Sequence, residues 1–190
     1  MRYASIRELD ISNGEGVGIS LFTQGCFFHC DNCFNKETWD YDGGKPWTKE
    51  TENNFLQLAE RPYIKRISIL GGEPLSAQNL SELLSLVNKI RILLPLKTIW
   101  LYTGFEWEQI FYPLEQSDIA TLRQEIVKKC DVVVDGLFDN SLRDITLKFK
   151  GSSNQRVIDV AKSVENNVVT TYKGALNDTQ QNRKRNNNYF

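Results

Sequence analysis

The sequence predicts an α/β fold in which mostly parallel strands form a partial, open (β/α) barrel. Short runs of β-branched and aromatic residues alternate with helical patterns, the order typical of βα units around a parallel sheet. The runs are too few to supply the eight strands of a closed barrel. Most of them end at glycine or polar residues, and ligands of parallel α/β folds bind beyond the carboxyl ends of the strands.

The predicted strands share a short apolar core that ends at a turn. The first predicted strand leads directly into a cysteine-rich loop. The residues of the last segment fit either a strand or a short helix. The strands are expected at residues 16–22, 67–70, 98–102, 132–134 and 156–160.

Helical periodicity is clearest at residues 80–94, where leucine, valine and isoleucine recur at intervals of three and four until Pro95. Residues 49–59 and 119–129 are also predicted to be helical. By contrast, residues 177–190 are rich in asparagine, glutamine and arginine and cannot bury enough apolar surface to order themselves. We therefore expect one folded domain at residues 1–176 and a flexible polar tail at 177–190.

Composition narrows the class of protein. A chain of 190 residues can bury one substantial core, and its net charge of -1 gives no reason to expect nucleic acid or an anionic membrane as partner. No apolar run approaches the ~20 residues of a membrane span. The first residues also lack the apolar stretch of a secretory signal, so we expect a cytoplasmic protein. A single histidine, His29, argues against serine-hydrolase triads and multi-histidine metal sites.

Three of the four cysteines, Cys26, Cys30 and Cys33, are clustered with gaps of three and two residues. Four cysteines normally hold a four-iron cluster, so three would leave one iron open for a substrate. The alternative is a structural zinc site with His29 or Cys130 as fourth ligand. Zinc sites usually show paired two-residue spacings, and no second pair is present, so the pattern favours the cluster. Cys130 stands in an apolar context and is given no role.

Gly71-Gly72-Glu73-Pro74 follows a predicted strand and precedes a predicted helix. By itself it is an ordinary turn and helix start. Next to the cysteine motif it also suits a ligand, because glycine lets a ligand approach the backbone and a carboxylate can bind an ammonium group. Thr103-Gly104 and Asp135-Gly136 are turns that could line the same ligand.

With these motifs in place, the chain resembles the activating enzymes of anaerobic (class III) ribonucleoside-triphosphate reductase, members of the radical S-adenosylmethionine (SAM) superfamily. Ordered blocks over most of the chain carry the resemblance, which makes it more specific than the cysteines alone. Besides the cysteine loop they are residues 13–16, 34–39, 71–75 with 78–79, 100–105, 134–136 and 151–156.

Some positions depart from the family pattern. His29 lies one residue later than usual, and Asn32 stands where the family has glycine. Phe34 follows the third cysteine and is expected to take the adenine contact. Glu73 replaces aspartate and keeps the carboxylate.

The resemblance implies a barrel of the radical SAM type and a [4Fe-4S] cluster on Cys26, Cys30 and Cys33 with SAM on its open iron. SAM would also contact residues around the third cysteine and residues that follow the predicted strands at 67–70 and 98–102. The implied activity is reductive SAM cleavage and glycyl-radical formation on the reductase, with a donor such as flavodoxin. Alternatives are another radical SAM enzyme, acting on a different glycyl radical enzyme or a small molecule, or a non-catalytic zinc-stabilised interaction module. The expected SAM contacts are Asn32, Cys33, Phe34, Gly71, Gly72, Glu73 and Thr103.

Overall fold

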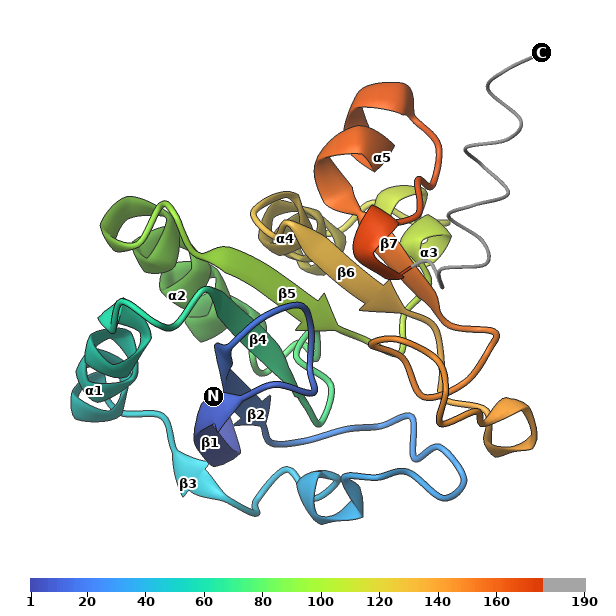
Figure 1. Ribbon diagram of the computed structural model, residues 1–190. Helices are drawn as coiled ribbons and strands as arrows, with labels where there is room; N and C mark the ends of the chain where they lie inside the picture. Colours follow the sequence, from blue (N-terminus) through green and yellow to red (C-terminus); the bar gives the residue numbers. More distant parts are fainter. Residues whose placement is uncertain (176–190) are drawn as a thin grey trace.

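The computed structural model describes residues 1–175, and the predicted tail at 177–190 lies outside the described residues. Within them, a seven-stranded mixed sheet has the order β3-β1-β2-β4-β5-β6-β7 (Figure 1). The strands are β1 Arg2–Asp10, β2 Gly18–Thr23, β3 Lys45–Pro46, β4 Arg66–Gly71, β5 Thr98–Tyr102, β6 Val132–Asp135 and β7 Arg156–Asp159.

The expectation of mostly parallel strands holds only for the middle of the sheet. The neighbours β2, β4, β5 and β6 are parallel, whereas β1 is antiparallel to both β2 and β3, and β7 is antiparallel to β6. β1 and β3 were not predicted from the sequence. β1 has few fully buried residues and therefore lacks the continuous apolar run that marks the central strands. The uncertain segment at 156–160 is a strand that leads directly into a helix.

The predicted helices are confirmed within one residue at most ends. Side-chain caps define two starts: the hydroxyl of Thr48 accepts from the amide of Thr51, and that of Ser117 accepts from Ala120, both at 3.1 Å. The short helices α3 and α5 were not predicted. The α-helices are α1 Lys49–Glu60, α2 Leu80–Leu93, α3 Trp107–Phe111, α4 Asp118–Lys128 and α5 Val160–Asn166, and the 3-10 turns are η1 Lys36–Thr38, η2 Asn140–Leu142 and η3 Lys173–Ala175.

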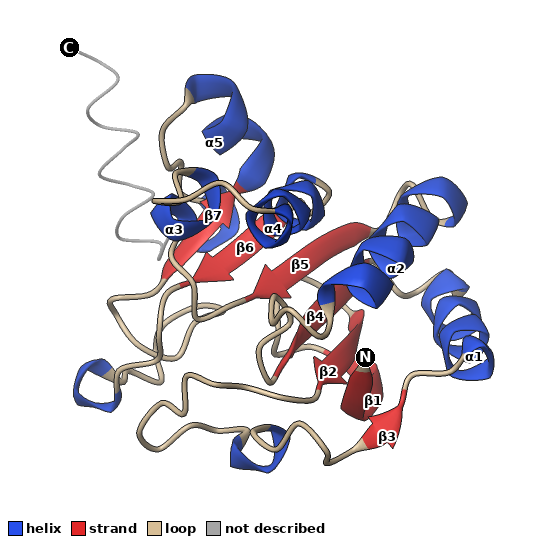
Figure 2. Ribbon diagram, turned by 180° about the vertical axis from the view of Figure 1, so that it is seen from behind, coloured by secondary structure: helices blue, strands red, loops and turns tan. Residues whose placement is uncertain are grey.

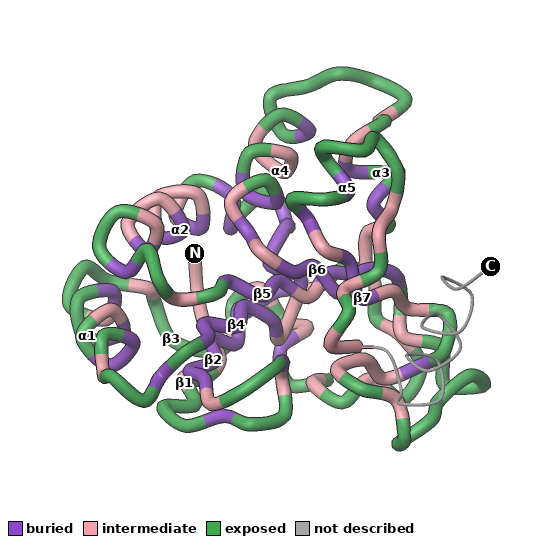
Figure 3. Tube along the Cα trace, turned by 45° about the horizontal axis from the view of Figure 1, so that its top comes forward, coloured by how far each residue is buried: buried purple, intermediate pink, exposed green. Residues whose placement is uncertain are grey.

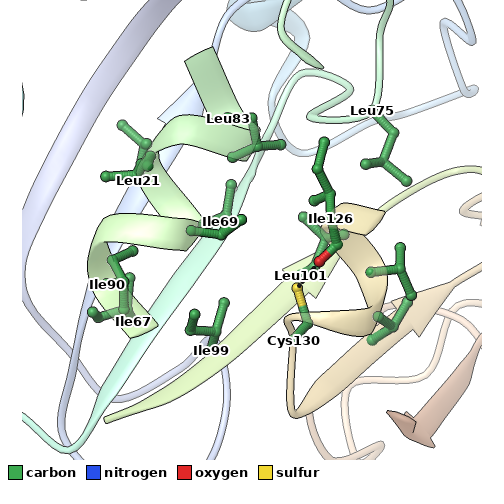
Figure 4. Close-up of a cluster of buried hydrophobic side chains, with 14 of the residues drawn as sticks. Leu21, Ile67, Ile69, Leu75, Leu83, Ile90, Ile99, Leu101, Ile126 and Cys130 are labelled. Atoms are coloured by element: carbon green, nitrogen blue, oxygen red, sulfur yellow. Dashed lines mark hydrogen bonds between the residues drawn. The ribbon is translucent and has the colours of Figure 1, made fainter. Parts of the chain in front are cut away.

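The main core lies between one face of the sheet and helices α1, α2 and α4 (Figure 2). Successive strand residues point to opposite faces, so every second residue of the central strands enters this core. Figure 3 shows the resulting band of buried residues through the middle of the sheet. Figure 4 shows the packing of Leu21, Ile67, Ile69, Ile99 and Leu101 against Leu83, Ile90 and Ile126 of the helices.

Loops rather than long helices cover part of the other face. Trp100 is buried there, and the rings of Phe149 and Tyr172 pack edge-on against it at 5.0 and 5.2 Å. The strand residues nearest the cysteine loop on this face are Phe22, Leu70 and Tyr102, and they line a cavity instead of a core. This face is therefore the one that can accommodate a ligand.

An ion pair stabilises the opposite, amino-terminal end of the parallel strands. Arg66 is fully buried; its guanidinium donates to the backbone oxygen of Asp10 at 2.8 Å and lies 3.4 Å from the Asp10 carboxylate. It also donates to the backbone oxygen of Asn13. A side chain at Gly14 would collide with Arg66 and Trp100, so the glycine of this turn is required by packing. The block 13–16 thus has a structural role at this end of the sheet.

Candidate functional site

Three loops meet at the carboxyl ends of β2, β4 and β5, as the fold prediction expected. Hydrogen bonds join them directly. The amide of Gly72 donates to the oxygen of Thr23, and that of Glu73 donates to the oxygen of Gly25, both at 2.8 Å. The amide of Gly104 donates to the Glu73 carboxylate at 2.8 Å. The cysteine loop, the Gly-Gly-Glu turn and the turn after β5 are therefore one assembly.

The cysteine loop leaves β2 and is held at its base by the segment after it. The amide of Gly25 donates to the oxygen of Thr38 at 2.8 Å, and that of Cys26 donates to the oxygen of Trp39 at 3.0 Å. Asn32 has a left-handed φ of 54°, a conformation that glycine and asparagine adopt most easily. This explains why asparagine can replace the glycine of the resembled family.

Cys26, Cys30 and Cys33 are half-buried and free, so their thiols are available for iron. Burial raises the pKa of the Cys26 and Cys30 thiols, and backbone hydrogen bonds offset only part of that effect. Both thiols are therefore protonated in the metal-free protein near neutral pH. A bound metal needs thiolates, so its positive charge would have to displace these protons.

The donor set fits an iron–sulfur cluster. In the part of the chain that the structure describes, no three His, Cys, Asp or Glu side chains are arranged to hold a single metal ion. A cluster is larger than an ion and takes each cysteine on a different iron, so thiols spread along one loop suit it. Three thiols and no fourth would leave one iron open.

The two residues considered as a fourth zinc ligand do not complete such a site. Cys130 lies in the main core (Figure 4). It comes just before β6 begins, whereas the cysteine loop follows the carboxyl end of β2. The Cys130 thiol donates to the backbone oxygen of Ile126 at 3.4 Å, and burial raises its pKa to about 12. His29 stacks on Trp39, with ring centroids 4.5 Å apart. The zinc arrangement with Cys130 is therefore wrong.

Glu73 is 1% exposed and its carboxylate is bonded within the protein. One oxygen accepts from the amide of Leu75 and the hydroxyl of Thr103, and the other accepts from the amide of Gly104, all at 2.8 Å. Burial outweighs these bonds and raises the pKa of Glu73 to about 7. Glu73 and Thr103, two of the expected SAM contacts, therefore bind each other.

Gly71 and Gly72 serve the packing of the chain itself. A Cβ on Gly71 would lie 2.8 Å from the Cα of Phe22, and one on Gly72 would lie 2.5 Å from the oxygen of Gly25. Gly71 also has a φ of +107°. Gly71 thus allows the close approach of β2, and Gly72 allows that of the cysteine loop. Their contact with a ligand, like that of Glu73, stays a prediction.

Two cavities flank the cysteine loop. One, of about 640 Å³, lies between the open sheet face and residues 143–151, with Phe34 and Tyr102 in its wall. The Tyr102 hydroxyl is buried and has no hydrogen-bond partner among the described residues. The other, of about 670 Å³, lies between residues 29–32 and 137–141. Each volume is in the range of small-molecule sites.

Sequence reasoning missed two contacts of the loop after β6. Phe34 is 59% exposed, its ring lies 5.1 Å from that of Phe138, and the Arg143 guanidinium lies 4.9 Å above it. No local signal could reveal contacts between segments so distant in the chain. Asp135, considered as a ligand-lining residue, instead accepts from the amide of Trp107 at 2.8 Å and pairs with Arg156, so it supports α3.

Comparison with known proteins agrees with this donor set. Residues 12–158 match the family model of a 4Fe-4S single cluster domain. Several curated relatives are named anaerobic ribonucleoside-triphosphate reductase-activating protein. That of Escherichia coli K12 is 39% identical over 83% of this chain and 97% of its own length. That of Enterobacteria phage T4 is 34% identical over 83% and 93%, and that of Haemophilus influenzae 31% identical over 82% and 96%.

Proposed function

The chain belongs to the family of anaerobic ribonucleoside-triphosphate reductase-activating proteins, and on this premise we propose that it is a radical SAM enzyme that generates a glycyl radical on such a reductase. The observation that carries the proposal is the set of three free thiols at the carboxyl ends of the parallel strands. Cys26, Cys30 and Cys33 would hold a [4Fe-4S] cluster with one iron open to SAM.

When bound, the cluster would pass one electron to the sulfonium of SAM, releasing methionine and a 5′-deoxyadenosyl radical that takes a hydrogen atom from a glycine of the reductase. The chain's own task is to bind, orient and shield these groups. This chemistry needs no general acid or base. The nearby carboxylate of Glu73 can therefore stay buried and hydrogen-bonded within the protein. A low-potential donor such as flavodoxin would supply the electron.

For the SAM contacts we propose two groups of residues. Asn32, Cys33 and Phe34 would contact the nucleoside, because the exposed Phe34 ring borders the cavity on the open sheet face. Gly71, Gly72, Glu73 and Thr103 would form the wall beside the methionyl end. Because the amide of Gly72 bonds to the last residue of β2 and that of Glu73 bonds to the base of the cysteine loop, these amides would act by holding that wall in place.

We further propose that the seven-stranded sheet corresponds to the partial barrel of the radical SAM type. Four parallel strands, helices on one face and a cavity on the other support this assignment. The reductase would complete the open side. The cytoplasm is the proposed location, since free cysteines persist in reducing compartments. In the described residues, no helix is long and apolar enough to cross a membrane.

The test is anaerobic reconstitution with iron and sulfide, followed by reduction and addition of SAM. The wild-type protein should bind four irons per chain as expected for one [4Fe-4S] cluster, and release 5′-deoxyadenosine. Serine at Cys26, Cys30 or Cys33 should remove both, whereas the matched control Cys130→Ser should retain both because that thiol lies in the core.

A class III reductase added to the loaded protein should then show a glycyl radical by electron paramagnetic resonance. Deoxyadenosine release without that radical would indicate another radical SAM enzyme. A colourless protein that retains zinc would refute the cluster altogether.

A further inference from the structure

Aromatic rings connect the cysteine loop to the end of β5. Phe27 and Phe28, between the first two cysteines, have ring centroids 4.3 Å apart. Both contact Phe105, at centroid distances of 5.8 and 5.1 Å. We call Phe27, Phe28 and Phe105 the aromatic cluster. Because it includes residues from two strand-end loops, it holds one against the other.

Within the cluster, Phe28 lies directly on Gly104. A Cβ at Gly104 would be 2.6 and 2.7 Å from two ring carbons of Phe28, closer than real Cβ contacts. Gly104 has no left-handed φ, so alanine fits its backbone. The Phe28 ring is the nearest obstacle to a side chain there, and a methyl carbon of Leu137 lies at 2.9 Å. The absence of a side chain at Gly104 is therefore what allows Phe28 to pack there.

Phe105 is also supported by α4. The Arg123 guanidinium lies 4.1 Å above the Phe105 ring, and its Nε donates to the backbone oxygen of Leu75 at 2.9 Å. The amide of Phe105 donates to the Thr103 hydroxyl, which in turn donates to Glu73. The surface against which Phe28 packs is thus fixed by hydrogen bonds and a cation–π contact.

We propose that Phe28 is a positioning residue that holds the Cys26–Cys30 stretch of the loop in the conformation that binds the cluster, by packing on Gly104 and Phe105. The inference rests on the proposed function in one respect only, that these cysteines bind a cluster. Backbone bonds hold Gly25 and Cys26 at the base of the loop. Beyond them, Phe27 and Phe28 both contact Phe105, and the Phe28 ring also packs directly on Gly104.

The experiment compares Phe28→Ala, Phe28→Tyr, Gly104→Ala and the double variant Phe28→Ala/Gly104→Ala with the wild type. Tyr63→Ala, a half-exposed aromatic on the α1–β4 connection, is the matched control. After reconstitution, iron loss to a chelator is timed, and the reduced cluster is recorded by electron paramagnetic resonance with and without SAM. Thermal unfolding of the metal-free proteins reports separately on folding.

We expect Phe28→Ala and Gly104→Ala each to lose iron about tenfold faster, the equivalent of 1.4 kcal/mol, and to show an altered spectrum. Phe28→Tyr keeps the ring and should behave as wild type. The double variant should be no worse than Phe28→Ala, because both changes remove one contact. A purely structural role would lower the unfolding temperature without changing the spectrum.

Wild-type iron retention and spectra in both single variants would overturn the inference, as would additive effects in the double variant. Failure of the proposed function is distinguishable, because then the wild type would bind no cluster or the cysteine variants would bind it equally well.

Discussion

Replacing Glu73 by glutamine should change how the stability of the protein depends on pH. Burial raises the pKa of this carboxyl from 4.5 to about 7. Between these values the folded state holds a proton that the unfolded state has lost, so the free energy of unfolding falls as pH rises from 4.5 to 7. The shift of about 2.5 units corresponds to about 3 kcal/mol. Glutamine does not titrate and removes this term.

The structure also sets the cost of the substitution. The glutamine oxygen can replace the carboxylate oxygen that accepts from Leu75 and Thr103, but its NH₂ group would face the amide of Gly104. One buried amide left without an acceptor costs about 1–3 kcal/mol at any pH. The variant should therefore be less stable than wild type at pH 5 and gain roughly 2–3 kcal/mol relative to it by pH 8.

Urea unfolding of the metal-free, reduced protein at pH 5 and pH 8, followed by tryptophan fluorescence, measures both values. Glu125→Gln, at an exposed position of α4, is the matched control and should leave the pH dependence unchanged. A stability difference between Glu73→Gln and wild type that is the same at both pH values, or that grows against the variant as pH rises, would refute the reasoning.

Other expected outcomes concern the fold. Asp10→Asn should cost about 3 kcal/mol, because it leaves the buried Arg66 charge without its partner; urea midpoints equal to wild type would contradict this. In the wild type, burial raises the pKa of Asp10, but hydrogen bonds from Asn13, Ser20 and Ser12 outweigh burial and lower the pKa to about 2. The contribution of the ionised carboxylate to stability is therefore complete above pH 4 and is lost as pH falls toward 2. Acid unfolding of the wild type and of Asp10→Asn should show this difference. Trp100→Ala should cost about 3–5 kcal/mol in calorimetry, because the ring is buried under Phe149 and Tyr172.

Local patterns predicted much of this protein. Helices α1, α2 and α4 were predicted from helical patterns, which are clearest in the apolar periodicity of α2, and the central strands were predicted from their apolar runs. The three cysteines were identified by spacing alone. These features depend on residues close together in the chain, so a sequence can carry them.

Only the tertiary structure decided what the motif residues contact. Gly71, Gly72 and Glu73 were expected to face a ligand, which stays a prediction; their nearest partners within the protein are the end of β2, the cysteine loop and the turn after β5. Phe28 carries no local signal of a role, yet it packs on a glycine far along the chain. Burial and packing depend on which segments the fold brings together, and no local pattern records that. The sequence alone therefore determined the chemistry of the thiols, whereas the fold determined how they are held.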